Sequence, residues 1–218
     1  MKKLLSTVCI SAMAISAVHA DDVALLTFKV GKDKNLKHAA IEFYQNDAPM
    51  TADNFKKLAR KKFYNGQAVH RVFPDTLLQM GDPLSKRSDR AKTGTGGPGY
   101  TLPPEIHRKH TKGAIAAGRL PDKINPGRLS NGSQFFICLT PMPSYDGQYT
   151  VFGNVIWGFD ELDQISELPV DTNDNPLQRV EIKSIQIMPR EKLPAPPVVG
   201  PTAPAPTKAK KKHWYQFF

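Results

Sequence analysis

The sequence predicts a mainly β fold, a closed β-barrel flanked by two helices. Short runs of apolar and β-branched residues recur from residue 23 to residue 187, and turn-forming residues separate them. Only two segments carry apolar residues at helical spacing. Many short strands with so few helices favour a sheet that closes on itself and buries its inner face.

The strands follow from their apolar patterns. We expect them at residues 23–30, 38–44, 68–73, 113–118, 133–139, 149–158 and 180–187. In the last of these the alternation changes phase near Lys183 and Ser184, which predicts a β-bulge.

Two segments are predicted to be helices. The first covers residues 48–64, with Thr51 as a candidate N-terminal cap. The second covers residues 159–168, where Leu162, Ile165 and Leu168 recur at helical spacing.

A loop rich in glycine, proline and charge is expected at residues 84–112. Its stretch TGTGGPGY lacks the Gly-Lys-Ser/Thr ending of a phosphate-binding loop, and Pro98 would interrupt the start of a helix. We therefore interpret it as a flexible connector.

The two ends of the chain differ from the body, residues 21–188. Residues 1–20 have the pattern of a signal peptide, because two lysines precede a short apolar run that ends in Val18-His19-Ala20. This predicts export, to the periplasm first and to the medium second; a retained N-terminal anchor is the alternative. Residues 189–218 are rich in proline and alanine, then basic, then aromatic, and are predicted to form a disordered tail.

Charge and cysteine content exclude some functions. The net charge is +10, but the two lysines of residues 1–20 and a net +5 in residues 189–218 leave only +3 for the body, which argues neither for nor against nucleic-acid binding. Nucleic-acid binding is not expected, because the basic run of the tail is short and the predicted destination lies outside the cytoplasm. The basic, aromatic tail would suit an anionic surface or a partner protein.

Cys138 would be the single cysteine of the exported chain, and no histidine or cysteine cluster has metal-ligand spacing, so we expect no disulfide, metal or cofactor. Nothing requires more than a monomer.

Arg71 is the first candidate functional residue. Strand alternation across residues 68–73 places it on one face with Val69 and Phe73. A guanidinium among apolar side chains is costly unless a partner compensates it. A structural ion pair and a functional role both remain open from these residues alone.

The strand at residues 133–139 has two different faces. Phe135, Ile137 and Leu139 form an apolar face that suits a core. Gln134 and Phe136 share the other face, which places an amide beside an aromatic wall.

Three segments resemble the cyclophilin family of peptidyl-prolyl isomerases. They are FYNGQAVHRVFPDTLLQMGDP, GTGGPGY and NGSQFFICLTPMPSYDGQYTVFGNVIWGFDELDQI, and the similarity extends over about residues 22–188. The resemblance implies an eight-stranded antiparallel barrel capped by two helices, and it implies isomerisation of X-Pro bonds without a cofactor.

The resemblance also implies roles for individual residues. Arg71 occupies the position of the family's catalytic arginine. Phe136 is expected to form the floor of the proline pocket. The remaining substrate-binding positions implied are His70, Thr76, Leu77, Gln79, Gly118, Arg119, Gln134, Tyr145 and Tyr149.

Some positions depart from the family pattern. Thr76 replaces a pocket phenylalanine, and Tyr145 and Tyr149 replace a leucine and a histidine. Ser144 replaces an aromatic residue that is important for cyclosporin binding, so we expect low sensitivity to that drug. The segment before Ser133 is longer than usual.

The chemistry of the reaction suits these residues. Rotation about an X-Pro bond crosses a barrier of about 18–20 kcal/mol without breaking a covalent bond, so a catalyst must stabilise the twisted amide. An arginine supplies a permanently charged, forked donor for that amide. The sequence therefore predicts an isomerase that acts on proline-containing segments of exported proteins. A non-catalytic proline-peptide binding module or chaperone on the same barrel is the alternative.

Overall fold

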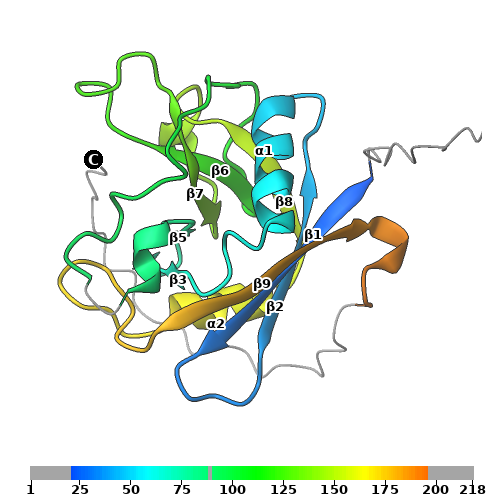
Figure 1. The fold of residues 1–218 in the computed structure, drawn as a ribbon, viewed down its shortest axis with the longest axis vertical. Helices are drawn as coiled ribbons and strands as arrows, with labels where there is room; N and C mark the ends of the chain where they lie inside the picture. Colours follow the sequence, from blue (N-terminus) through cyan, green and yellow to red (C-terminus); the bar gives the residue numbers. More distant parts are fainter. Residues whose placement is uncertain (1–20, 88–89, 196–218) are drawn as a thin grey trace, which may run out of the picture.

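A computed structural model describes residues 21–87 and 90–195 of the chain. Nine strands form one antiparallel sheet, and two helices pack against it (Figure 1). The strands are β1 (Asp22–Val30), β2 (Lys37–Phe43), β3 (Ala68–Val69), β4 (Arg71–Phe73), β5 (Leu77–Met80), β6 (Ala114–Arg119), β7 (Ser130–Cys138), β8 (Val151–Trp157) and β9 (Val180–Pro189). The helices are α1 (Pro49–Arg60) and α2 (Phe159–Ser166), and short 3₁₀ turns lie at Pro83–Lys86, Pro143–Tyr145 and Arg190–Lys192.

The sheet runs in the order β3-β9-β1-β2-β8-β6-β7-β5-β4. Its two end strands, β3 and β4, follow each other in the chain and are separated only by His70. Among the described residues no ladder of hydrogen bonds joins β3 to β4. The mainly β fold with two helices is therefore confirmed, whereas closure of the sheet into an eight-stranded barrel is not.

The core lies inside the curved sheet and under the helices. α1 contributes Phe55, Leu58 and Ala59 to it, and α2 contributes Leu162 and Ile165. In the view of Figure 1, α1 lies in the upper part of the molecule and α2 in the lower part. The helical spacing that predicted both helices is the spacing of these buried side chains.

The alternation in β7 is confirmed. Phe135 and Ile137 belong to the main core, whereas Phe136 and Cys138 belong to a second, smaller apolar cluster on the opposite face. The bulge in β9 is confirmed as well, because Thr27 pairs with Ser184 while Phe28 pairs with Ile182, which leaves Lys183 as the extra residue.

The predicted strand at residues 68–73 is interrupted at His70. Val69 and Val72 both point into the main core, while Arg71 and Phe73 lie on the other face. The prediction that Arg71 shares a face with Val69 is therefore wrong, because the break at His70 shifts the alternation by one residue.

The N-terminus of α1 is capped from a distant loop. Ala48 occupies the cap position and its side chain makes no capping bond. The carboxylate of Glu105 instead accepts the backbone N–H groups of Met50 at 2.9 Å and Thr51 at 2.8 Å, and the Thr51 hydroxyl at 2.7 Å. Thr51 is thus a donor to the cap, and its prediction as the capping residue is wrong.

Both predicted terminal segments lie wholly or mainly outside the described residues. This holds for the predicted signal peptide at 1–20 and for residues 196–218 of the predicted tail. The structured part extends slightly beyond residue 188, because Arg190 bonds to Glu42 at 2.6 Å. No helix within 21–87 and 90–195 is long and apolar enough to span a membrane.

Candidate active site

A single row across four strands carries the candidate site. Arg71 of β4 lies opposite Gln79 of β5, Gln79 lies opposite Phe136 of β7, and Phe136 lies opposite Ala116 of β6. Residues opposite each other on neighbouring strands point to the same side of a sheet. The register therefore brings together Arg71, Gln79 and Phe136, which the sequence analysis had singled out separately.

Arg71 lies at the edge of this row and is partly exposed. Its guanidinium carbon lies 5.1 Å from the centre of the Phe73 ring, and Nη2 lies 3.8 Å from Oδ2 of Asp174. Both partners of this ion pair are about one-third exposed. Arg71 therefore has both an aromatic and an ionic neighbour, and its donors face a solvent-accessible groove.

The groove beside Arg71 has a volume of about 630 Å³. Carboxylates line part of its wall, and Asp171 is paired with Arg90 at 3.7 Å. The lining residues are His70, Arg71, Gln79, Arg90, Ala91, Thr93, Gly94, Thr95, Asp171, Thr172, Asn173, Asp174 and Asn175.

The two site glutamines bind each other. Nε2 of Gln79 donates to Oε1 of Gln134 at 3.0 Å, and Nε2 of Gln134 donates to the carbonyls of Gly94 at 2.9 Å and Gly96 at 2.8 Å. Both side chains are buried. The Gln134 amide thus holds the glycine-rich loop against the site.

Asp82 holds the same loop from the other side. Its buried carboxylate accepts the N–H of Gly94 and, at 3.2 Å, the N–H of Gly96. The glycine-rich stretch was expected to be a flexible connector, but its backbone is fixed at both its N–H and its carbonyl groups. Gly96 has no room for a side chain, since a Cβ there would lie 2.1 Å from the Asp82 carboxylate.

Aromatic rings surround Phe136 and form a pocket-like cluster. Tyr149 packs edge-on to Phe136 with ring centres 5.5 Å apart, and Tyr145 does so at 5.9 Å. Leu77 and Met142 belong to the same cluster. Four of the predicted substrate-binding residues therefore lie in one cluster, namely Leu77, Phe136, Tyr145 and Tyr149.

His110 belongs to this cluster and was missed. Its ring stacks on Phe136 with centres 6.1 Å apart and an interplanar angle of 10°, and its side chain is fully buried. Nδ1 lies 3.1 Å from Oδ1 of Asp146, which also accepts the His110 backbone N–H at 2.7 Å. Burial lowers the pKa of His110, and the Asp146 carboxylate opposes that shift. The residue lay in the segment at 84–112 that was predicted only to be a loop, so no pattern pointed to it.

Arg119 lies at the rim of the cluster. Its guanidinium carbon is 4.7 Å from the Tyr149 ring centre, and Nε donates to the Gln148 carbonyl at 2.8 Å. Nη1 is 2.5 Å from Oδ1 of Asp122. The side chain is thus held by its own surroundings. Gly118 precedes it and packs against Gln134, since a Cβ there would lie 3.3 Å from the Gln134 Cβ.

The other predicted positions lie in turns or under the site. The Thr76 hydroxyl donates to the Pro74 carbonyl at 3.1 Å, and Ser144 is exposed in the turn before Tyr145. His70 is buried at the break between β3 and β4, and its N–H donates to the Gln79 carbonyl at 3.0 Å. Burial lowers the pKa of His70 to about 4; Arg71 acts in the same direction, and Asp82 opposes it.

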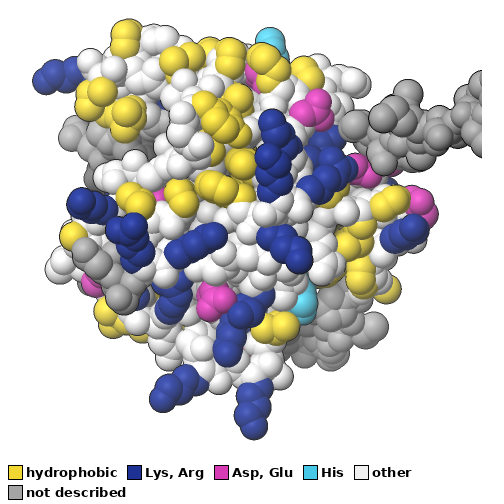
Figure 2. All heavy atoms as spheres, viewed as in Figure 1, with side chains coloured by type: hydrophobic (Ala, Val, Ile, Leu, Met, Phe, Trp, Pro, Cys, Tyr) yellow, Lys and Arg dark blue, Asp and Glu magenta, His cyan; other side chains and the backbone are white. Residues whose placement is uncertain are grey.

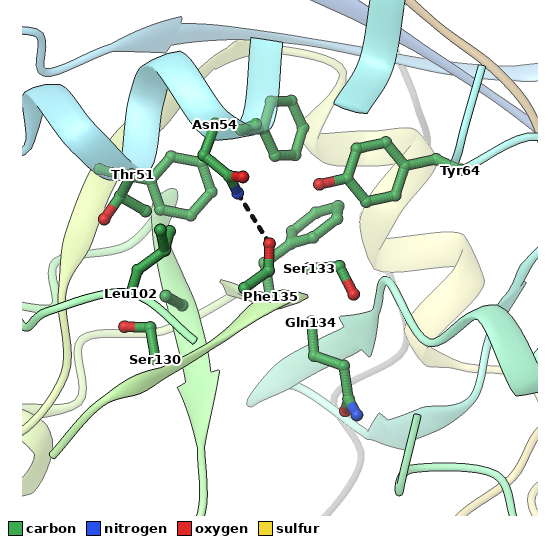
Figure 3. A pocket seen from close by; sticks show the side chains of 12 residues that line it. Thr51, Asn54, Tyr64, Leu102, Ser130, Ser133, Gln134 and Phe135 are labelled. Carbon is green, nitrogen blue, oxygen red and sulfur yellow. Dashed lines mark hydrogen bonds between the residues drawn. The ribbon is translucent and has the colours of Figure 1, made fainter. Parts of the chain in front are cut away.

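A second cavity lies on the opposite face of β7, under α1 (Figure 3). Asn54 spans it and donates to the Gly132 carbonyl at 2.7 Å, the bond drawn in the figure. Its volume of about 10 Å³ is the size of one water molecule, so it is too small for a peptide. Gln134 borders it, but Phe135 rather than Phe136 forms its wall. The groove at Arg71 is therefore the candidate site.

Comparison with known proteins gives the family. The model of "Cyclophilin type peptidyl-prolyl cis-trans isomerase/CLD" matches residues 26–187. The chain belongs to this family. The predicted resemblance is thus confirmed, and so is the prediction of an isomerase.

Individual relatives agree with this assignment. Peptidyl-prolyl cis-trans isomerase-like 1 of Neurospora crassa is 35% identical over 71% of this chain and 91% of its own length. A peptidyl-prolyl cis-trans isomerase of Synechococcus elongatus is 43% identical over 52% of this chain and 70% of its own length.

Solved cyclophilin structures share the fold. A crystal structure of a cyclophilin type isomerase of Cryptosporidium parvum has a TM-score of 0.65 at 26% identity and covers 77% of this chain and 97% of that chain. A second structure of that protein, in the presence of the dipeptide Ala-Pro, has a TM-score of 0.63, again at 26% identity, over 77% and 98% of the two chains.

No group of three or more histidine, cysteine, aspartate or glutamate side chains within the described parts of the cyclophilin chain could hold a metal ion. Cys138 is a buried free thiol, and burial raises its pKa to about 12. It is therefore present as the unreactive thiol at neutral pH.

Proposed function

We propose that the row Arg71–Gln79–Phe136 is the catalytic site of this cyclophilin, and that it stabilises the twisted X-Pro amide of a bound peptide. The single observation that carries the proposal is the register that places these three side chains opposite one another. Arg71 is the catalytic residue in this proposal, and the cluster around Phe136 receives the proline ring.

Each residue has a distinct part in the proposed mechanism. Loss of amide resonance makes the proline nitrogen an acceptor, and the Arg71 guanidinium donates to it and to the rotating carbonyl. The apolar ring cluster fixes the proline while the preceding residue turns. Gln79 and Gln134 hold the glycine-rich loop and orient the peptide backbone.

The energies required are within reach of such a site. A ten-thousandfold acceleration requires about 5.5 kcal/mol of selective transition-state binding. A charge-assisted donor in a partly desolvated groove, with a fixed proline ring, supplies stabilisation of that order. Asp174 does not prevent this, because an ion pair at 3.8 Å whose partners are both about one-third exposed contributes only about 0–1 kcal/mol and gives way to substrate.

The proposed substrates are proline-containing segments of exported proteins, and the proposed location is the periplasm. The pattern of residues 1–20 supports both. The Ala-Pro dipeptide in the related Cryptosporidium parvum structure supports the proline part of the proposal.

The decisive experiment is exchange spectroscopy on an Ala-Pro peptide with the wild type and with Arg71→Ala. We expect the cis/trans exchange catalysed by the wild type to fall at least about a hundredfold in the variant, because the loss of a charge-assisted donor costs about 3 kcal/mol. Arg190→Ala, at an exposed arginine paired with Glu42, is the matched control and should keep full turnover.

The same data separate catalysis from binding. A folded wild-type protein that binds the peptide without accelerating exchange would support the non-catalytic module. Turnover that survives in Arg71→Ala would refute the proposed role of Arg71.

A further inference from the structure

The loop between β6 and β7, residues 120–129, carries an unusual share of the exposed apolar surface. Three of the seven exposed large hydrophobic side chains of the described residues lie in it, and they are Leu120, Ile124 and Leu129, with 57%, 68% and 40% of their surface exposed. Single exposed aliphatic side chains are ordinary, whereas three within ten residues make this loop a candidate interaction surface. We call this segment the aliphatic loop.

The aliphatic loop has a fixed conformation. Two overlapping turns form it, because the N–H groups of Ile124 and Asn125 both donate to the Pro121 carbonyl, and the N–H of Arg128 donates to the Asn125 carbonyl. The Asn125 side chain closes the loop through its bonds to Leu129, donating to its carbonyl at 2.8 Å and accepting its N–H at 3.1 Å. The aliphatic side chains are therefore presented on an ordered backbone.

One carboxylate ties the aliphatic loop to the rim of the candidate active site. Asp122 contacts Arg119 at 2.5 Å and Arg128 at 2.8 Å. The two arginines hold the pKa of Asp122 below its ordinary value. Arg119 lies over the Tyr149 ring, and Nη1 of Arg128 donates to the Gly147 carbonyl at 2.8 Å.

The loop is thus continuous with the aromatic cluster around Phe136. Tyr149 packs on Phe136, Arg119 packs on Tyr149, and Leu120 follows Arg119 in the chain. The loop leaves the sheet where β6 ends and returns where β7 begins (Figure 1). Hydrophobic side chains are also grouped in the upper part of the face shown in Figure 2, whereas basic side chains are spread over it.

We propose that the aliphatic loop is a second binding surface, which holds an apolar segment of an unfolded polypeptide whose proline lies at Phe136. This inference rests on the proposed isomerase function. The occupant follows from the chemistry. The charged side chains near Tyr149 already form ion pairs within the chain. What the loop offers to a binding partner is therefore its aliphatic side chains. A folded client would bury such residues, whereas an unfolded one exposes them beside its prolines.

The consequence is a preference among substrates. A short peptide such as an Ala-Pro tetrapeptide occupies the groove only, whereas a longer chain also covers the loop. Burial of two or three aliphatic side chains on an ordered surface should lower KM for an apolar segment by about five- to tenfold.

The test uses two extended proline peptides of equal length, one with leucines and one with serines on both sides of the same Ala-Pro core. Turnover is measured with the wild type, with Leu120→Ser/Ile124→Ser/Leu129→Ser, and with the matched control Leu36→Ser/Met50→Ser/Leu177→Ser. The control removes three exposed hydrophobic side chains from elsewhere on the surface. Each turnover measured with an extended peptide is divided by the turnover of the Ala-Pro tetrapeptide by the same protein.

We expect the wild type and the control to favour the leucine peptide by about five- to tenfold, through a lower KM. The loop variant should lose most or all of that preference. Equal preference in all three proteins would overturn the proposal. Dimerisation of the wild type in sedimentation, lost in the loop variant, would also overturn it, since a second copy of the chain would then be the occupant. If the wild type does not turn over the tetrapeptide, the proposed function fails, and the inference that rests on it fails with it.

Discussion

At the residue scale, the arginine of β4 (Arg71–Phe73) is accommodated by its neighbours. The break at His70 turns Arg71 away from the main core, so its guanidinium meets the Phe73 ring and the Asp174 carboxylate at the edge of a groove. The structural ion pair and the functional role, both left open by the sequence, are thus compatible. The ion pair is long and partly exposed, so it orients the side chain without withdrawing it from substrate.

His110 shows how a buried polar residue can serve an aromatic cluster. Its ring extends the stack on Phe136, while Asp146 binds both Nδ1 and the backbone N–H and so fixes the ring plane. A leucine at this position would fill space but would lack this anchor. We infer that His110 positions Phe136 through this stack.

His70 makes the stability of the protein pH-dependent. Burial lowers its pKa to about 4 in the folded state, while the ordinary value is 6.5. Between these values the unfolded chain binds the proton and the folded chain does not, so stability falls as pH falls through this window. The full shift corresponds to about 3 kcal/mol.

We measure the free energy of unfolding with urea at pH 7.5 and at pH 4. The loss of stability between these two pH values should be about 3 kcal/mol smaller in His70→Asn than in the wild type. His107→Asn, at an exposed histidine, is the matched control and should follow the wild-type curve. Parallel curves for His70→Asn and the wild type would show that His70 protonates equally well in the folded state.

At the element scale, the periodic features were predictable and the long-range ones were not. Alternation in β7 assigned Phe135 to the core and Phe136 to the opposite face, and helical spacing found the buried face of α1. The residue types of the row at Arg71 were likewise found, because the family resemblance marked them. Such signals are local, and each buried face repeats along a single element.

The missed features join segments far apart in the chain. Glu105 caps a helix 54 residues away, and Asp146 binds a histidine 36 residues away. Neither contact leaves a repeating pattern in the sequence, and each involves a residue of the loop at 84–112. The break at His70 was missed for a related reason, since Val72 donates to the carbonyl of Asp174 rather than to a neighbouring strand.

The cap of α1 gives a prediction for this element. Glu105 is buried and satisfies two backbone N–H groups and one hydroxyl at the helix start. In Glu105→Ala these donors lose their acceptor, which should lower the free energy of unfolding by about 2–3 kcal/mol. Chemical denaturation measures this loss directly.

Glu167→Ala is the matched control, because Glu167 is exposed at the end of α2. It should change stability by less than about 0.5 kcal/mol. Equal stability of Glu105→Ala and this control would show that solvent replaces the carboxylate at no cost.

At the scale of the whole molecule, β1 organises the sheet. It lies between β2 and β9 and pairs with β9 from Asp22 to Val30. Its residues Val23, Ala24 and Leu26 are fully buried. The first strand of the described residues therefore begins two residues after the predicted cleavage position.

This arrangement predicts where processing can occur. Cleavage after Ala20 leaves Asp21, whose carbonyl accepts the Arg190 N–H at 3.1 Å, and Asp22, whose carboxylate binds Arg60 at 2.7 Å. Mass spectrometry of the protein released from the periplasm of an expressing bacterium should therefore find Asp21 as its first residue. A chain that retains Met1 there would contradict the predicted signal peptide.

Thermal unfolding tests the structural half of the same argument. A chain that begins at Asp21 keeps every pair of β1, whereas a chain that begins at Thr27 loses three fully buried core side chains and the first half of two ladders. Loss of a large buried side chain such as Leu26 costs about 2–5 kcal/mol. Together with Val23, Ala24 and the lost ladder hydrogen bonds, at about 1 kcal/mol each, this equals or exceeds the stability of an ordinary domain. The shorter chain should consequently show no cooperative transition, and a transition at the temperature of the longer chain would mean that β1 is dispensable for the fold.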